Sequence, residues 1–185
     1  MKRITTACFT GHRPAQLPFT VARDSVRYNR LANLLDYYIV YLYRAYGVTT
    51  FISGMALGVD MLAAERVLAL RSPELPLKLI CALPCEEQAH KWQPADRSRY
   101  LKICDAADEV IYIDKEYTAD CMQKRNRFMV KSSAYCIAVW NGDTGGTSST
   151  VRLARKDKLT IFIIDPNDFT VSVEKGEPEL GLFDM

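Results

Sequence analysis

The feature that most limits the fold of this chain is a regular alternation between short apolar runs and longer helical patterns. Short apolar runs bounded by turn residues are typical of buried strands, whereas apolar residues at three- and four-residue steps are typical of amphipathic helices. The runs expected to form strands are ITTACFT (4–10), VTTFIS (48–53), LPLKLICALP (75–84), EVIYID (109–114), AYCIAVW (134–140) and LTIFIID (159–165). Such strands, separated by helices, predict an α/β fold: a Rossmann-like, doubly wound, mainly parallel sheet sandwiched by helices.

The segments between these runs predict the helices. A long amphipathic helix is expected from Asp24 or Ser25 to Gly47, and a second helix follows GMALGVD and continues to about Arg71. The polar segment 86–107 and the segment 121–133 are expected to be helical as well, and VRLARK is expected to form a basic helix. The 185 residues fit one domain, 1–185, whose tail after residue 166 is expected to form an edge strand and a loose end.

Composition narrows the class of protein. The formal net charge of +2 gives no polyelectrolyte signature, so nucleic acid is not an expected partner. The N-terminus does not resemble a signal peptide and no apolar stretch is long enough to span a bilayer, which predicts a cytoplasmic protein without a membrane partner. Six cysteines without a CxxC pair and only two histidines provide no zinc-site spacing, so Cys8, Cys81 and Cys136 are expected to be buried, reduced thiols. The sequence leaves the oligomeric state open, a homo-oligomer included.

The expected ligand site follows from the topology. In an open parallel sheet, ligands bind outside the carboxyl ends of the strands. The loops at that edge are TGHRP, SGMALGVD, LPCEEQ and NGDTGGTSST, and three of these four are rich in glycine with hydroxyl or charged residues. Their gathering at one edge is the main functional signal in the sequence.

The loop SGMALGVD offers two glycines, a hydroxyl and a carboxylate. Gly54 and Gly58 allow another backbone or a ligand to come close, and Ser53 can donate a hydrogen bond. Asp60 lies in the first turn of the following helix, where its carboxylate can accept hydrogen bonds from ribose hydroxyls. The alternative is that Asp60 only complements the helix dipole while the glycines permit tight packing.

The loop TGHRP contributes Thr10, Gly11 and Arg13, of which Arg13 is a bidentate partner for phosphate or carboxylate. His12 is a candidate general acid or base, although the sequence shows no residue that would orient it. A hydrogen-bonding role on the surface is the alternative for His12.

The loop NGDTGGTSST resembles an anion-binding nest. Gly145 and Gly146 supply inward-facing N–H groups, and Thr147 and Thr150 lie among four consecutive hydroxyl residues that can complete the coordination of a phosphate. One such residue suffices to cap a helix, so four exceed that need. The absence of a P-loop lysine argues against ATP hydrolysis.

Two weaker features remain. The segment QKRNRF places four polar residues in the first turns of a helix, namely Gln123, Arg125, Asn126 and Arg127. Either some of these side chains face the carboxyl edge of the sheet, or all of them lie on a solvated helix face. Trp92 either stacks on a base or packs in the ordinary way.

These motifs, in this order, resemble the YpsA-like proteins of the SLOG superfamily, which is named for the DNA-processing protein DprA (Smf) and the Lonely Guy (LOG) phosphoribohydrolases. The resemblance covers nearly the whole chain. It implies a glycine-rich edge that binds a nucleotide or nucleotide-derived ligand such as ADP-ribose or an NAD-like molecule, in a sensing or regulatory role linked with bacterial stress or cell division. By carry-over, Gly58 and Asp60 are the key ligand contacts, and Gly145, Gly146 and Thr147 bind the phosphate.

One departure separates the chain from the LOG hydrolases, which carry PGGxGTxxE with a catalytic glutamate. Alignment of the paired glycines places Thr144 at the proline, Ser148 at the third glycine and Arg152 at the glutamate. An N-glycosidic or phosphoribosyl hydrolase would therefore need Asp60 or Glu65 instead, and these lie roughly 140° apart around an ideal helix. DprA-like single-stranded DNA binding is the third hypothesis; it needs a basic groove with stacking aromatic residues.

Overall fold

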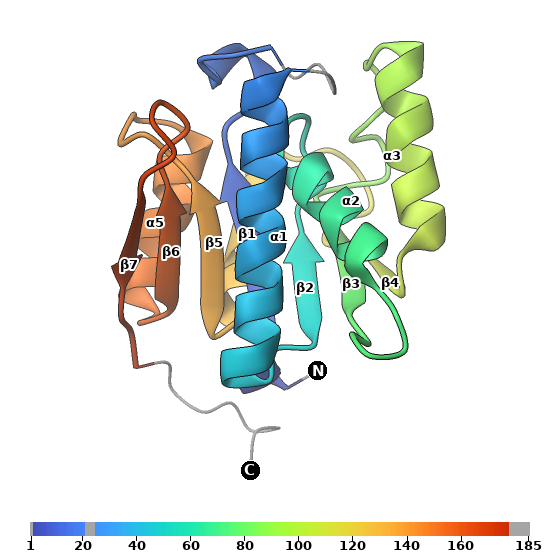
Figure 1. Cartoon of the computed structure of the whole chain (residues 1–185). Coiled ribbons are helices and arrows are strands. Elements are labelled where there is room, and N and C mark those ends of the chain that lie inside the picture. The colour runs from blue at the N-terminus through green and yellow to red at the C-terminus, as the bar shows by residue number, and fades with distance from the viewer. Residues whose placement is uncertain (1, 21–24, 178–185) are drawn as a thin grey trace.

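A computed structural model describes residues 2–20 and 25–177 of the chain, and its centre is a seven-stranded sheet (Figure 1). The strands are β1 (Thr6–Gly11), β2 (Thr50–Ser53), β3 (Lys78–Leu83), β4 (Glu109–Tyr112), β5 (Tyr135–Val139), β6 (Thr160–Ile164) and β7 (Val171–Glu174). The α-helices are α1 (Val26–Tyr46), α2 (Val59–Leu70), α3 (Pro94–Ala106), α4 (Cys121–Lys131) and α5 (Gly146–Lys156).

The strand order is β4-β3-β2-β1-β5-β6-β7, and every neighbouring pair is parallel except β6 and β7. The chain thus builds one half of the sheet outward from β1 to β4, then returns and builds the other half from β5 to β7. This order confirms the predicted doubly wound α/β fold, and β7 is the edge strand expected after residue 166. The reversal falls between β1 and β5, which makes their carboxyl ends the topological switch point of the sheet.

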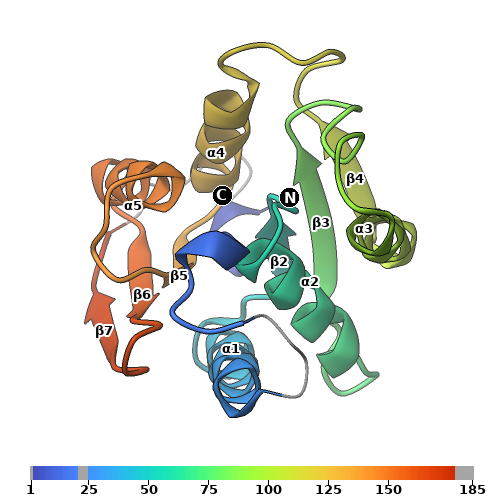
Figure 2. The same cartoon turned by 90° about the horizontal axis from the view of Figure 1, so that it is seen from above.

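Helices cover both faces of the sheet. Seen from above, α1, α2 and α3 lie on one side and α4 and α5 on the other (Figure 2). Two buried clusters follow this division because successive strand residues point to opposite faces. On β1, Phe9 packs towards α1 and α2, with its ring centroid 5.7 Å from that of Phe51, whereas Cys8 points into the cluster under α4 and α5.

The helix boundaries follow local capping chemistry. The Ser25 hydroxyl accepts a hydrogen bond from the Tyr28 amide at 3.0 Å and begins α1, and Gly47 ends it in the left-handed conformation with φ of 66°. Asp24, the alternative start, lies outside the described residues.

Several predicted elements were too long. The strands expected at 48–53 and 75–84 span only Thr50–Ser53 and Lys78–Leu83. The first strand begins at Thr6 rather than at residue 4, because residues 3–5 form a 3-10 turn. The predicted helix 86–107 is helical only over Pro94–Ala106, and Pro94 occupies its first turn, where the missing N–H costs no hydrogen bond. The preceding polar residues form turns instead.

The burial predicted for three cysteines is confirmed. Cys8, Cys81 and Cys136 are free and fully buried on strands β1, β3 and β5. Among the described residues no group of three or more histidine, cysteine, aspartate or glutamate side chains could hold a metal ion. No helix in the described ranges is long and apolar enough to cross a membrane.

Candidate functional site

The candidate site is a pocket at the carboxyl ends of β1 and β5, which is here called the switch-point pocket. It has a volume of about 120 Å³ and lies between the β1 loop, the start of α2, and helices α4 and α5. Figure 2 looks down on this edge and shows these elements around the centre of the sheet. The lining residues are Phe9, Thr10, Gly11, Arg13, Gln16, Ala56, Asp60, Met122, Arg125, Asn126, Met129, Gly146, Thr147 and Thr150.

The structure brings most of the predicted site residues together. Those that line the pocket are Thr10, Gly11, Arg13, Asp60, Gly146, Thr147 and Thr150. They come from three separate loops, and the order β2-β1-β5 places these loops side by side. The predicted residues Ser53, Gly54, Gly58 and Gly145 do not line it.

Ser53 and Gly58 do not line the pocket but hold the β2 loop in its conformation. The buried Ser53 hydroxyl donates to the Asp60 carbonyl at 2.8 Å and accepts from the Met55 amide at 3.1 Å. Gly58 has φ of 97°, and a Cβ there would lie 2.6 Å from the His12 carbonyl oxygen. Only glycine therefore fits where the β2 loop meets the β1 loop, and these contacts hold Asp60 in place.

Asp60 is a carboxyl group that would be costly to ionise. It is 6% exposed and accepts a hydrogen bond from the Ala56 amide at 3.4 Å. Burial raises the pKa of the Asp60 carboxyl from 3.8 to about 6, although the nearby Arg125 guanidinium and the Ala56 amide oppose the rise. Its charge therefore changes close to neutral pH, which is common for functional carboxylates.

Arg125 is buried at the pocket. The sequence had left two positions open for it, the ligand-binding edge of the sheet or a solvated helix face. Its guanidinium donates to the Gly54 carbonyl oxygen and, at 2.7 Å, to the Asn126 side-chain oxygen. Burial lowers the pKa of Arg125, yet an arginine stays charged at any physiological pH. It supplies the pocket with a desolvated cation beside Asp60.

Gly54 provides the space for this arginine. A Cβ on Gly54 would collide with Arg125 Nη1 and lie 2.9 Å from an Asp60 carboxylate oxygen. The glycine thus allows the backbone, the guanidinium and the carboxylate to approach one another, rather than allowing a ligand to approach.

The N-terminus of α5 forms the opposite wall. Gly146 and Thr147 are the first residues of the helix, whose leading N–H groups have no partner within it. The Ser148 hydroxyl accepts from the Gly145 amide at 3.0 Å, and the Thr150 hydroxyl donates to the Gly146 carbonyl at 3.1 Å. Ser148 therefore closes the loop by capping, which leaves the helix N-terminus with its positive dipole end towards the pocket.

His12 is buried rather than on the surface. It is 2% exposed, and its Nε2 lies 2.8 Å from the side-chain oxygen of Asn141. This contact ties the β1 loop to the β5 loop, and His12 is not among the residues that line the pocket. Trp92 also lies elsewhere, with its ring edge-on to that of Tyr100 at 5.3 Å.

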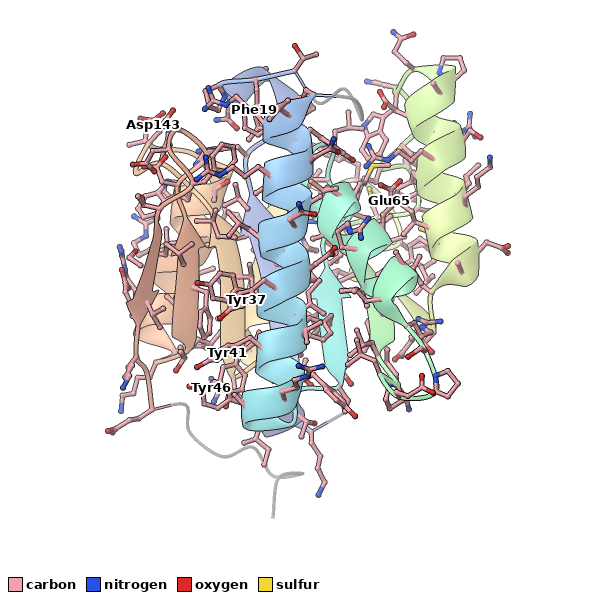
Figure 3. All side chains as sticks on the ribbon, viewed as in Figure 1. Phe19, Tyr37, Tyr41, Tyr46, Glu65 and Asp143 are labelled. Atoms are coloured by element: carbon pink, nitrogen blue, oxygen red, sulfur yellow. The ribbon has the colours of Figure 1, made fainter. Side chains whose placement is uncertain are left out.

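The second carboxylate considered for hydrolysis is engaged away from the pocket. Glu65 points towards α3 (Figure 3), where its two oxygens accept from Arg99 at 2.6 and 2.8 Å. Arg152 is exposed on α5 and does not line the pocket. Among the described lining residues, Asp60 is the one carboxylate that faces the cavity.

The fold and the pocket define a class: a Rossmann-like α/β protein with a polar, positively charged pocket at its switch point. The family model that matches is YpsA, described as the YspA SLOG family, and it covers residues 7–169. The chain belongs to this family, as its loop motifs predicted.

Relatives of this family are bacterial proteins. The chain is 31% identical over 121 residues to the SPbeta prophage-derived protein YoqJ of Bacillus subtilis, covering 59% of this chain and 71% of YoqJ. It is 24% identical over 180 residues to the UPF0398 protein YpsA of the same organism, covering 90% and 95% of the two chains.

Two solved structures share the fold. DNA processing protein A from Helicobacter pylori, whose structure concerns a single-stranded DNA binding mode, superposes with a TM-score of 0.58 at 20% identity. DprA from Streptococcus pneumoniae superposes with a TM-score of 0.59 at 17% identity. Each match covers 88% of this chain but only 66% and 50% of those chains, so this chain corresponds to part of each DprA.

Proposed function

We propose that this protein binds a nucleotide or nucleotide-derived ligand, of the ADP-ribose or NAD type, in the switch-point pocket, and acts as a sensor or regulator in bacterial stress or cell division. One observation carries the proposal. Arg13 and the N-terminus of α5 line the same small pocket as Asp60, Arg125 and Asn126. Such a pocket offers an anion site and a hydrogen-bonding site to the same molecule.

The phosphate of the ligand is assigned to the α5 side. The leading N–H groups of α5 and the positive end of its dipole attract an anion, and the Arg13 guanidinium can bind phosphate in a bidentate manner. The pocket contains two arginines and one carboxylate, so its charge is positive whether or not Asp60 is ionised.

The sugar is assigned to the Asp60 side, where the carboxylate and the Asn126 amide can accept and donate hydrogen bonds to hydroxyl groups. Pockets that enclose drug-sized ligands have volumes of roughly 300–1,000 Å³. The switch-point pocket has about 120 Å³, so it holds the phosphate and sugar portion while the remainder of the ligand extends over the sheet edge.

The family and the shared fold support this proposal at a coarser level, since both fit nucleotide or nucleic-acid binding in general. They do not distinguish ADP-ribose from other nucleotides. The choice of ligand class depends on the pocket itself.

The test is a thermal-shift and calorimetry panel of ADP-ribose, NAD, AMP and cyclic nucleotides. We expect at least one to bind the wild type and to bind Asp60→Ala much more weakly. Asp105→Ala, which removes an exposed carboxylate of α3, is the matched control and should bind as the wild type does. No response of the wild type to the whole panel, or equal binding by Asp60→Ala, contradicts the proposal.

Single-stranded DNA binding is a second candidate, because the Helicobacter pylori neighbour is described as a single-stranded DNA binder. A row of tyrosines that could stack on bases lies on α1, on the opposite side of the sheet from α4 and α5 (Figures 1 and 2). Figure 3 shows Tyr37, Tyr41 and Tyr46 in a row along that helix, well below the sheet edge that holds the pocket. A gel shift with an oligothymidylate at low and moderate salt distinguishes the two functions. We expect no shift. A shift that Arg13→Gln abolishes would instead favour DNA binding at the switch-point pocket.

A further inference from the structure

A second cavity, larger than the switch-point pocket, lies between α4 and α5 and is here called the α4–α5 cavity. Its volume is about 420 Å³. The two helices lie side by side on the same face of the sheet (Figure 2) and contact each other. The lining residues are Arg127, Val130, Lys131, Leu153, Lys156 and Asp157, none of which lines the switch-point pocket.

Three cations around this cavity lack an acidic partner. Arg127, Lys131 and Lys156 are exposed, and within residues 2–20 and 25–177 none of them forms an ion pair. Neighbouring cations on the same helices do have partners: Lys124 pairs with Asp114, and Arg155 pairs with Glu174. Arg152 of α5 is also exposed and without an ion pair among the described residues, but it lies outside the cavity. Arg127, Lys131 and Lys156 share the cavity, where they repel one another unless an anion lies between them.

Another cation, Arg3, contacts the chain just after each of the two helices. Arg3 donates to the carbonyl oxygen of Ser133, just after α4, and to that of Asp157, just after α5, at 3.0 Å in both cases. It therefore bridges the ends of the two helices and fixes their separation at this end. An arginine at helix C-termini also complements the negative ends of the two dipoles.

The local charge is large for this chain. Three cations, Arg127, Lys131 and Lys156, and one carboxylate, Asp157, give the lining a formal charge of +2. The whole chain of 185 residues carries the same net charge of +2. A small lining with this charge is the pattern of an anion-binding surface.

We propose that the α4–α5 cavity is a second ligand site, separate from the switch-point pocket, for the polyphosphate group of a small molecule. Cations from two helices flank the space, so a group with two or more phosphates can contact both sides at once. The described lining contains no aromatic side chain, and binding of single strands depends on aromatic stacking. A small polyphosphate fits this lining better than a nucleic-acid strand does.

The cavity is placed to influence the switch-point pocket. Arg127 follows Asn126 directly on α4, and Leu153 lies one turn after Thr150 on α5. An anion that draws α4 and α5 together therefore acts on two helices that also line the switch-point pocket.

The test uses inorganic tripolyphosphate as the probe, titrated into the full chain by calorimetry without divalent metal. The cavity variant is Arg127→Gln/Lys131→Gln/Lys156→Gln. The matched control, Lys91→Gln/Lys102→Gln/Arg152→Gln, removes the same charge from exposed positions outside the cavity. A third protein, Arg13→Gln, alters the switch-point pocket and leaves the cavity intact.

We expect tripolyphosphate to bind the wild type and the cavity variant to lose roughly tenfold in affinity, since three exposed charge contacts disappear. The control variant and Arg13→Gln should retain the wild-type affinity for the cavity. The proposal is overturned by any of three results: no binding to the wild type, an equal loss in the control variant, or a loss in Arg13→Gln alone. It is also overturned if an oligothymidylate, and not tripolyphosphate, binds through the three residues.

This test is independent of the proposed nucleotide function. Failure of the cavity leaves the behaviour of Asp60→Ala with nucleotides unchanged, and failure of the nucleotide panel leaves the comparison between the cavity variant and its control intact.

Discussion

Replacement of Asp60 by asparagine should stabilise the ligand-free protein at alkaline pH. The wild-type carboxyl is buried, and its pKa is raised from 3.8 to about 6 by that burial. In the folded state the proton is therefore bound more tightly than in the unfolded state, so the unfolded state releases it first as the pH rises. Wild-type stability should fall between about pH 4 and pH 6 and then remain level.

The magnitude follows from the two pKa values. Their difference, at about 1.4 kcal/mol per pKa unit, corresponds to about 3 kcal/mol of stability lost above pH 7. The asparagine side chain cannot ionise, so Asp60→Asn should escape this loss and gain up to about 3 kcal/mol, or roughly 6–12 °C in melting temperature for a chain of this size. The gain should vanish below about pH 4, where the wild-type carboxyl is protonated in both states.

The assay is urea unfolding of the wild type and Asp60→Asn between pH 4 and pH 8. Asp105→Asn, which replaces an exposed carboxylate of α3, is the matched control. If Asp60→Asn is less stable than the wild type at pH 8, the attraction between Asp60 and Arg125 outweighs desolvation and the reasoning is refuted.

Three further predictions concern the surroundings of Asp60. Gly54→Ala should cost about 1–3 kcal/mol and weaken nucleotide binding, because the new methyl group collides with the Arg125 guanidinium; urea unfolding and calorimetry measure both effects. Arg125→Met should raise the pKa of Asp60 further, since it removes a cation that lowers this pKa. It should cost about 1–3 kcal/mol through the lost hydrogen bond to the Gly54 carbonyl, which keeps only the longer one from the Gln88 amide at 3.4 Å. Carboxyl NMR titration and urea unfolding test this, and an unchanged pKa of Asp60 contradicts it. Glu65→Gln should lower the free energy of unfolding by about 1 kcal/mol or less and leave nucleotide binding unaltered, because the partner of Glu65 is Arg99 outside the pocket. A loss of nucleotide binding would contradict this and indicate that Glu65 belongs to the site.

The sequence was sufficient for the fold and for the edge that holds the pocket. Apolar strand runs and their helical spacers determine a parallel sheet, and the rule for its carboxyl edge then selects the loops that contain Arg13, Asp60 and Thr147. Local pattern and topology were sufficient to predict that these three residues lie at the pocket.

The burial of Arg125 at the pocket could not be predicted in the same way. Arg125 lies in the polar segment QKRNRF, which has the composition of a solvated helix face. Only tertiary packing buries it, because α4 lies on the sheet where Gly54 leaves room for the guanidinium. Gly54 was predicted to let another backbone or a ligand come close, because a sequence shows that space is required but not what fills it.

The predicted extent of the third helix, 86–107, was wrong for a related reason. Residues 86–93 contain the charged and polar residues of a surface helix, yet they form turns that place the Gln88 amide against the Met55 carbonyl at 2.7 Å. That contact spans 33 residues and supports the β2 loop, so local propensity did not reveal it.

The most direct test of the account is a crystal structure of the protein with the nucleotide that binds best in the panel. We predict that its phosphate lies at the N-terminus of α5, within hydrogen-bond distance of Thr147 and Arg13, and that its sugar hydroxyls face Asp60. A phosphate bound elsewhere, or a sugar directed away from Asp60, would contradict the central claim.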